Sequence, residues 1–287
     1  MVAETTVADL KRLLRAEVGC LFGQDDRPWK RPIVEMLRDF RDSGLRVAVF
    51  GGTLRSLLYS RLYRHRPGRP RDVDLVIHDG LLRDVERRFR EYLFRRTRFG
   101  GLQLRRDGWR FDVWTIDDTW AFRGENRYRA KIQNLPSTTP FNLEAIAVEA
   151  WPLAGRPREV FSGNDQFFEG ILSKTVELNS HDDPCPALTI VRGLVLATEH
   201  SFRVGPQLAE YVAAIGSSLT ESEFEEQQIR HYGHVRLGAS ALRNLIASIA
   251  KQCGHTERVQ LPQLGQLTLW PTWPIPDAGC RVDPLER

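Results

Sequence analysis

The sequence lacks the features that mark secreted, membrane-spanning and disordered proteins. Only four of its 287 residues are cysteine and none form a CxxC pair, which excludes a disulfide framework of the secreted type. No signal-peptide segment opens the chain, and its longest uncharged stretch, residues 259–276, is broken by proline. Because apolar residues make up 41% of the chain, we expect a folded cytoplasmic protein that makes no membrane contact.

Net charge is also small, but the basic residues are unevenly placed. Lysine and arginine total 41 against 37 acidic residues, and arginine is dense between residues 55 and 110. The run RHRPGRPR at residues 64–71 is a basic loop interrupted by proline and glycine. Its arginines, Arg64, Arg66, Arg69 and Arg71, are candidates for binding a nucleic-acid backbone; the alternative is a solvated surface insertion.

Hydrophobic periodicity predicts an α+β fold followed by a mostly helical region. We expect helices over 6–18, 29–43, 53–63 (with Thr53 as N-cap) and 81–94, strands over 47–50, 73–77, 145–151 and 159–161, and a hairpin of 102–104 with 110–116. Four further helices are expected over 187–201, 206–218, 221–231 and 236–251. The predicted domains are residues 1–150, with a catalytic core from about residue 36, and a helical domain over 151–287 that ends in a tail rich in proline and tryptophan.

Three aspartates occur where a carboxylate needs a partner. Asp72 and Asp74 alternate on one predicted strand, so their side chains share a face about 7 Å apart. Asp112 lies in the middle of another strand, where burying an unpartnered carboxylate is costly. A divalent cation held by these carboxylates would remove that cost.

The strand that ends at Gly51 and Gly52 leads directly into a helix. Backbone N–H groups at such a helix N-terminus suit a phosphate group. A phosphate site combined with paired carboxylates predicts nucleotidyl or phosphoryl transfer with two metal ions flanking the reacting phosphorus.

The runs VAVFGGTLRSLL and RDVDLVI carry a family resemblance. They resemble the head domain of class II CCA-adding enzymes and bacterial poly(A) polymerases, in the polymerase-β nucleotidyltransferase superfamily. The similarity extends over residues 36–201 and is strongest over 46–77. It implies a mixed-sheet head followed by a helical neck and body. It also implies roles for Asp72, Asp74 and Asp112 as catalytic and metal-binding residues, and for Gly51, Gly52, Thr53, Arg55, Asp183 and Arg192 as nucleotide-binding residues.

The sequence departs from the family pattern at the element that reads the incoming base. The family has Glu-Asp-x-x-Arg at the neck helix, where this chain has Asp182-Asp183-Pro184-Cys185-Pro186. The Asp is kept, but Pro186 replaces the Arg, and Thr189 replaces another Arg one turn later. A base edge that an Asp–Arg pair would read therefore loses one half of its hydrogen-bonding partner.

The resemblance implies a template-independent nucleotidyltransferase that uses two Mg²⁺ ions, with Mn²⁺ as a substitute. It would transfer a nucleoside monophosphate from an NTP to an RNA 3′ end, most simply a tRNA-like one, with non-standard nucleotide selection. Two alternatives stay open at this point: transfer to a protein or small molecule, and a non-catalytic RNA-binding or regulatory protein that keeps the fold.

Overall fold

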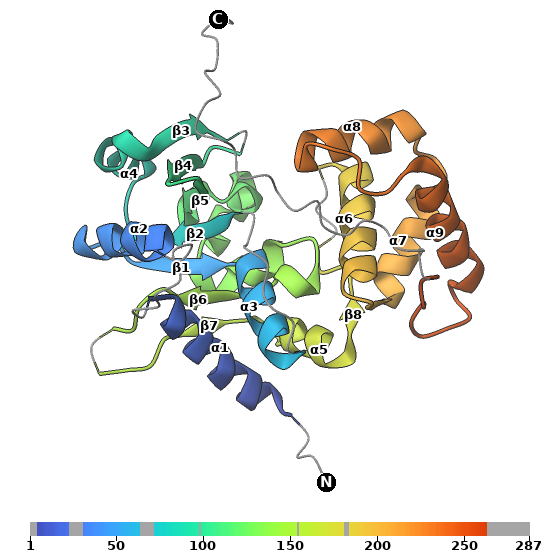
Figure 1. Ribbon diagram of the computed structural model, residues 1–287, viewed down its shortest axis with the longest axis horizontal. Coiled ribbons are helices and arrows are strands. Elements are labelled where there is room, and N and C mark those ends of the chain that lie inside the picture. The colour runs from blue at the N-terminus through green and yellow to red at the C-terminus, as the bar shows by residue number, and fades with distance from the viewer. Residues whose placement is uncertain are drawn as a thin grey trace, which may run out of the picture.

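The computed structural model describes residues 5–22, 31–63, 72–97, 99–153, 155–180 and 184–262. A seven-stranded mixed sheet lies on one side of the molecule and a group of helices on the other (Figure 1). The strand order is β3-β4-β5-β2-β1-β6-β7, and β2 pairs with β5 in parallel whereas the other neighbours are antiparallel. The strands are β1 (Val47–Phe50), β2 (Val73–Ile77), β3 (Leu93–Arg96), β4 (Leu102–Arg106), β5 (Trp109–Thr115), β6 (Ala147–Glu149) and β7 (Val160–Phe161).

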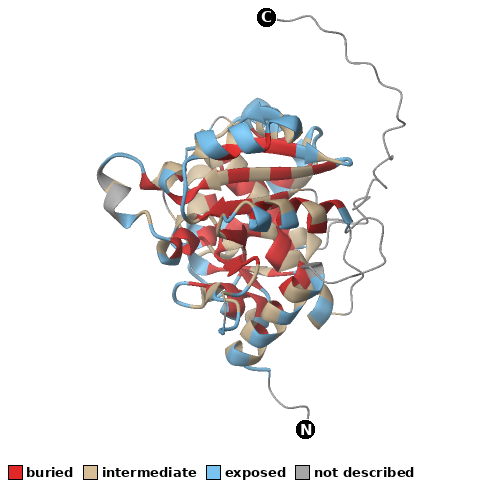
Figure 2. Ribbon diagram, turned by 90° about the vertical axis from the view of Figure 1, so that its left-hand side faces the viewer, coloured by how far each residue is buried: buried red, intermediate tan, exposed pale blue. Residues whose placement is uncertain are grey.

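One face of the sheet is covered by helices that present apolar stripes to it. These helices are α1 (Val7–Phe22), α2 (Arg31–Asp42), α3 (Gly52–Leu62) and α4 (Leu82–Arg88). Val49, Leu75 and Val113 point to this face and are fully buried in the main core. Figure 2 shows how buried residues concentrate along the strands. The expected strands 47–50 and 73–77 are confirmed at the same bounds.

The opposite face of the sheet is covered over only part of its area. A second core joins Ala48 and Val76 of the sheet to Phe122 and Leu135 of the chain between β5 and β6. That chain is a series of 3₁₀ helices, η2 (Ile116–Asp118), η3 (Trp120–Phe122), η4 (Gly124–Arg129), η5 (Ile132–Thr138) and η6 (Asn142–Glu144). Residues 72, 74, 110 and 112 project from this same face because side chains alternate along each strand.

The C-terminal half is helical, as expected. Its helices are α5 (Gln166–Ser173), α6 (Pro186–Glu199), α7 (Pro206–Ile215), α8 (Glu221–Tyr232) and α9 (Ala239–Gln252), with a two-stranded parallel sheet of β8 (Thr175–Val176) and β9 (Arg203–Val204). Figure 1 shows α6 to α9 grouped beside the sheet. The main core continues without a break from the sheet into these helices. The domain boundary at residue 150 stays a prediction.

The structure differs from the sequence expectations at two helices. The helix expected over 81–94 ends at Arg88, and Leu93–Arg96 form the edge strand β3 instead. Helical spacing of apolar residues predicted the longer helix, but pairing with β4 overrides that local preference. Helix α5 was not expected at all. Among the described residues, no helix has the length and apolar character required to span a bilayer.

Candidate active site

The turn from β1 into α3 is built on Gly51. Its backbone has φ 64° and ψ −125°, a region that is essentially restricted to glycine. Its N–H donates to the carbonyl of Ile146 at 2.9 Å, and its own carbonyl accepts the N–H of Arg55 at 3.2 Å. Helix α3 then begins at Gly52, and the first N–H groups of an α-helix have no acceptor within the helix. The turn therefore offers backbone donors to an anion.

Gly51→Ala should destabilise the protein by about 1–3 kcal/mol, the cost of placing a side chain in this backbone region. Its Cβ would also lie 3.8 Å from Oδ2 of Asp74. Gly52→Ala is the matched control, because Gly52 lies inside the helix and its Cβ would meet only the far end of the Arg55 side chain, at 3.6 Å. Urea unfolding of both variants measures the difference. Equal stabilities would contradict the strained turn.

Thr53 does not cap the helix, contrary to expectation. The N-cap is Gly51, and Thr53 lies one residue inside the helix, where it is buried. Its hydroxyl donates to the carbonyl of Asp72 at 3.1 Å. The side chain thereby joins the glycine turn to the start of β2, and only the backbone N–H of Thr53 is left to face an anion.

The structure places Asp74 and Asp112 side by side. They are direct partners in the parallel pairing of β2 with β5, and Phe50 is the partner of Asp74 on β1. Both carboxylates project from the incompletely covered face of the sheet and are half-buried. Because Phe50 immediately precedes the glycine turn, the two carboxylates lie on the central strands close to the turn that can bind an anion.

Two side chains that were not predicted as site residues hold the aspartates. Gln103 of β4 is the cross-strand partner of Asp112 and donates to its Oδ1 at 2.7 Å. Arg110 of β5 contacts Oδ2 of Asp72 at 2.9 Å. Gln103 is only 3% exposed. In the sequence it stands between Leu102 and Leu104, a pattern that strand alternation would equally give to a residue in solvent, so it was not singled out.

The oxygen donors fit a divalent cation, with Asp74 and Asp112 as the adjacent pair. Carboxylate oxygens on neighbouring strands are the ligand type that Mg²⁺ takes, together with substrate phosphates and water. Asp72 was expected to join them, but its carboxylate contacts Arg110. Within the described part of the chain, no group of three or more His, Cys, Asp or Glu side chains is arranged to hold a metal ion.

A largely buried carboxylate, Glu144 at the end of η6, joins the two arginines expected to bind nucleotide. Both Oε atoms of Glu144 accept from Nη2 of Arg192 at 2.7 Å. Nη1 of Arg55 lies 3.5 Å from Oε1 of the same carboxylate. Arg55 belongs to α3 and Arg192 to α6, so Glu144 ties the sheet region to the helical half beside the glycine turn.

Glu144 and Arg192 each favour the charged form of the other, and Arg55 also favours the charged form of Glu144. Burial alone would raise the pKa of the Glu144 carboxyl, but Arg192 and Arg55 hold that pKa below its ordinary value. Burial opposes the charged form of Arg192, yet Glu144 raises the pKa of Arg192, and attraction by Asp74 contributes in the same direction. Arg192 therefore contacts Glu144 directly and lies within electrostatic reach of Asp74.

Arg55 retains hydrogen-bonding capacity inside the protein. Its Nε and Nη1 atoms are buried and have no hydrogen-bond partner in the described structure. Unsatisfied buried donors of this kind are uncommon and call for an acceptor. A phosphate or ribose oxygen bound beside the glycine turn would supply one.

Several predicted site residues lie outside the described residues. They are Asp183 of the base-reading element and the four arginines of the basic loop, Arg64, Arg66, Arg69 and Arg71. Pro186, which replaces the family Arg, is the first residue of α6, and Thr189 on the same helix is buried.

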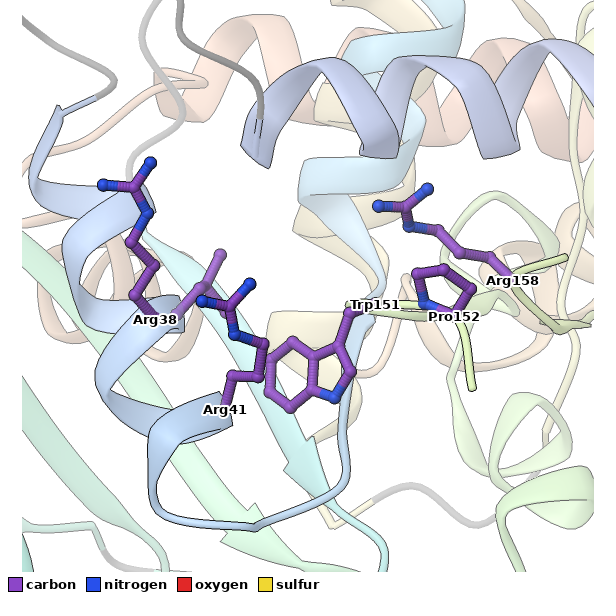
Figure 3. A pocket seen from close by; sticks show the side chains of 6 residues that line it. Arg38, Arg41, Trp151, Pro152 and Arg158 are labelled. Carbon is purple, nitrogen blue, oxygen red and sulfur yellow. The ribbon is translucent and has the colours of Figure 1, made fainter. Parts of the chain in front are cut away.

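A separate pocket was not anticipated from the sequence. It has a volume of about 540 Å³ and is lined by Leu37, Arg38, Arg41, Trp151, Pro152 and Arg158. Figure 3 shows the arginine side chains of α2 on one side of the indole of Trp151, with Arg158 on the other. None of these residues belongs to the aspartate and glycine site described above.

No protein-family model and no curated protein sequence matches this chain. Solved structures do. A CCA-adding enzyme in complex with ATP superimposes with a TM-score of 0.56 at 17% identity, over 82% of this chain and 54% of that one. The Thermotoga maritima CCA-adding enzyme complexed with tRNA gives a TM-score of 0.55 at 16% identity, over 82% and 54%. The chain has the fold of the CCA-adding enzymes.

The expected architecture, a mixed-sheet head of this type followed by a helical region, is thereby confirmed. A third match, a CCA-adding enzyme with CTP, has a TM-score of 0.53 at 15% identity and covers 76% of this chain and 50% of that one. This chain spans about half the length of the CCA-adding enzymes that it matches.

Proposed function

We propose that this protein is a template-independent nucleotidyltransferase that adds nucleoside monophosphate from an NTP to an RNA 3′ hydroxyl. The observation that carries the proposal is the adjacency of Asp74 and Asp112 on the parallel central strands β2 and β5, beside the end of β1 where the Gly51 turn begins α3. The fold supports it, since similar structures are CCA-adding enzymes solved with ATP and with tRNA.

The reaction joins the acceptor hydroxyl oxygen to the α-phosphorus of the NTP and breaks the bond to the bridging oxygen, releasing pyrophosphate. Mg²⁺ held by Asp74 and Asp112 would stabilise charge on the phosphates and lower the pKa of the attacking hydroxyl. Backbone N–H groups at Gly52 and Thr53 would bind the terminal phosphates. Arg55 would donate to phosphate oxygens through Nε and Nη1, which make no hydrogen bond to the described residues.

Asp72 differs from Asp74 and Asp112 because its carboxylate forms an ion pair with Arg110. Oδ2 of Asp72 pairs with Arg110, so to join a metal bound at Asp74 its carboxylate would have to share or open this ion pair. Arg192 would stay fixed by Glu144 and face the incoming nucleotide beside Asp74.

Incubation of the purified protein with Mg²⁺, each labelled NTP in turn and total cellular RNA tests the proposal. Label in RNA together with released pyrophosphate supports it, and omission of Mg²⁺ should abolish both. Pyrophosphate release with label in protein or in a small molecule would instead support the superfamily's other acceptors. Absence of pyrophosphate release with every NTP would contradict the enzyme assignment.

We expect base selection to be weaker than in a CCA-adding enzyme. Pro186 has no side-chain donor to pair with Asp183, and a site discriminates strongly by hydrogen bonding only where the donors and acceptors exist. Rates of incorporation of the four NTPs on one RNA acceptor measure this. Ordered addition of two C and one A would contradict the expectation.

A further inference from the structure

Three arginines lie beside the aspartates, on the side of the site away from the glycine turn. Arg110 of β5 is the cross-strand partner of Arg105 on β4, and Arg95 on the edge strand β3 is the partner of Gln103. Gln103 is in turn the partner of Asp112. Because cross-strand partners project from the same face, these arginines share the face of the sheet that carries the aspartates.

The three cations are close enough to oppose one another's charge. Partial burial lowers the pKa of the Arg105 guanidinium, and repulsion from Arg110 and Arg95 lowers it further. Arg110 has Asp72 as its counterion. Arg95 donates to the neutral amide oxygen of Gln103 at 3.2 Å, and within the described residues neither Arg95 nor Arg105 pairs with a carboxylate.

An exposed aromatic ring adjoins these charges. Phe94 is 49% exposed, and the guanidinium carbon of Arg105 lies 3.4 Å from the centre of its ring. The Arg95 guanidinium lies 5.9 Å from the same ring. Stacking surfaces next to positive charge are what proteins use to bind single-stranded nucleic acid.

Protection of the sheet edge against pairing with another sheet explains these arginines less well than binding of a polyanion does. Charged residues on an edge strand do prevent sheets from pairing edge to edge, and Arg95 and Arg96 on β3 could serve that purpose. Edge protection does not require further arginines on the inner strands β4 and β5, where they repel one another and share the face of the sheet that carries the aspartates. A polyanion would remove that repulsion.

We propose that Phe94, Arg95 and Arg105, here called the β3–β4 strip, bind the single-stranded 3′ end of the RNA acceptor. The arginines would contact its phosphates and Phe94 would stack on a base. The position rests on the proposed function: with the triphosphate at the Gly51 turn beside β1, the strip lies across Asp74 and Asp112 from it. The acceptor hydroxyl would then approach from the side of Asp112.

The test compares two double variants that remove the same charge. Arg95→Ser/Arg105→Ser alters the strip, and Arg83→Ser/Arg87→Ser removes two exposed arginines from α4, which covers the other face of the sheet. Binding of a fluorescein-labelled single-stranded oligoribonucleotide is followed by anisotropy over a range of salt concentrations. Thermal melting confirms that each variant folds.

We expect the strip variant to raise Kd about tenfold or more and to reduce the log–log salt slope by about 1.4, since each phosphate contact on a single strand contributes about 0.7. Phe94→Ala should raise Kd about fivefold to 150-fold, the range for loss of one stacked base. In transfer assays the strip variant should raise KM for RNA while leaving KM for the NTP unchanged. The α4 variant should resemble the wild type in Kd, in salt slope and in both KM values.

The outcomes separate this proposal from the proposed function. Equal Kd, salt slope and acceptor KM in the strip and α4 variants would overturn the role of the strip even if the protein transfers nucleotides. A wild-type protein that does not bind the oligoribonucleotide would also overturn it. RNA binding that depends on the strip, without any nucleotide transfer, would support the binding surface and contradict the proposed enzyme activity.

Discussion

If the proposed function holds, Asn in place of Asp74 or Asp112 should reduce nucleotidyl transfer about a thousandfold or more, because several kcal/mol of transition-state stabilisation would depend on the metal that these carboxylates are proposed to hold. The protein should remain folded, since both side chains are half-buried on the incompletely covered face of the sheet and Asn preserves their shape. Single-turnover rates with a fixed RNA acceptor measure the effect, and thermal melting measures the stability.

Asp79→Asn provides the matched control for these variants. Asp79 lies two residues after the end of β2, its side chain is 72% exposed, and its ion pair with Arg46 is long, at 3.5 Å. We expect its transfer rate to equal that of the wild type. A rate for Asp112→Asn within a few-fold of the wild type would show that the carboxylate pair does not carry the chemistry.

The part of the site that is local in sequence could be predicted from the residues alone. The apolar run 47–50 ends at two glycines, and the alternation of Asp72 and Asp74 places their side chains on one face, so turn and strand follow from short patterns. The hairpin was predictable for the same reason. Asp107 and Gly108 have φ of 46° and 72°, the positive values that a two-residue turn of this type requires.

Contacts between distant segments were not predictable in this way. Nothing in the motif around Glu144 indicates that it pairs with Arg55 of α3 and Arg192 of α6, because each lies in a separate local pattern. The ion pair of Arg110 with Asp72 depends on the register between β5 and β2, which only the assembled sheet defines. Strand β3 escaped prediction because its pairing with β4 overrides a helical spacing of apolar residues.

Replacing Glu144 by Gln should lower the free energy of unfolding by about 3 kcal/mol, the lower end of the cost of removing one partner from a buried ion pair. The substitution leaves Arg55 and Arg192 largely buried with like charges and no counterion between them. Glu226→Gln is the control, because its pair with Arg230 is exposed on both sides and should be worth less than about 1 kcal/mol. Urea unfolding at neutral pH measures both variants.

The stability of the wild type and that of Glu144→Gln should depend differently on pH. The pKa of Glu144 in the folded state is lowered from an ordinary value of 4.5, since Arg192 and Arg55 offset the effect of burial. A carboxyl with a lowered pKa stabilises the fold fully above its unfolded pKa, and this contribution is lost as the pH falls through the folded value. The stability gap between the wild type and Glu144→Gln should therefore be constant from neutral pH down to about pH 5 and should narrow below about pH 4.5. Urea unfolding at each pH measures the gap, and a gap that stays constant in acid would mean that the charge of Glu144 does not hold the two arginines in place.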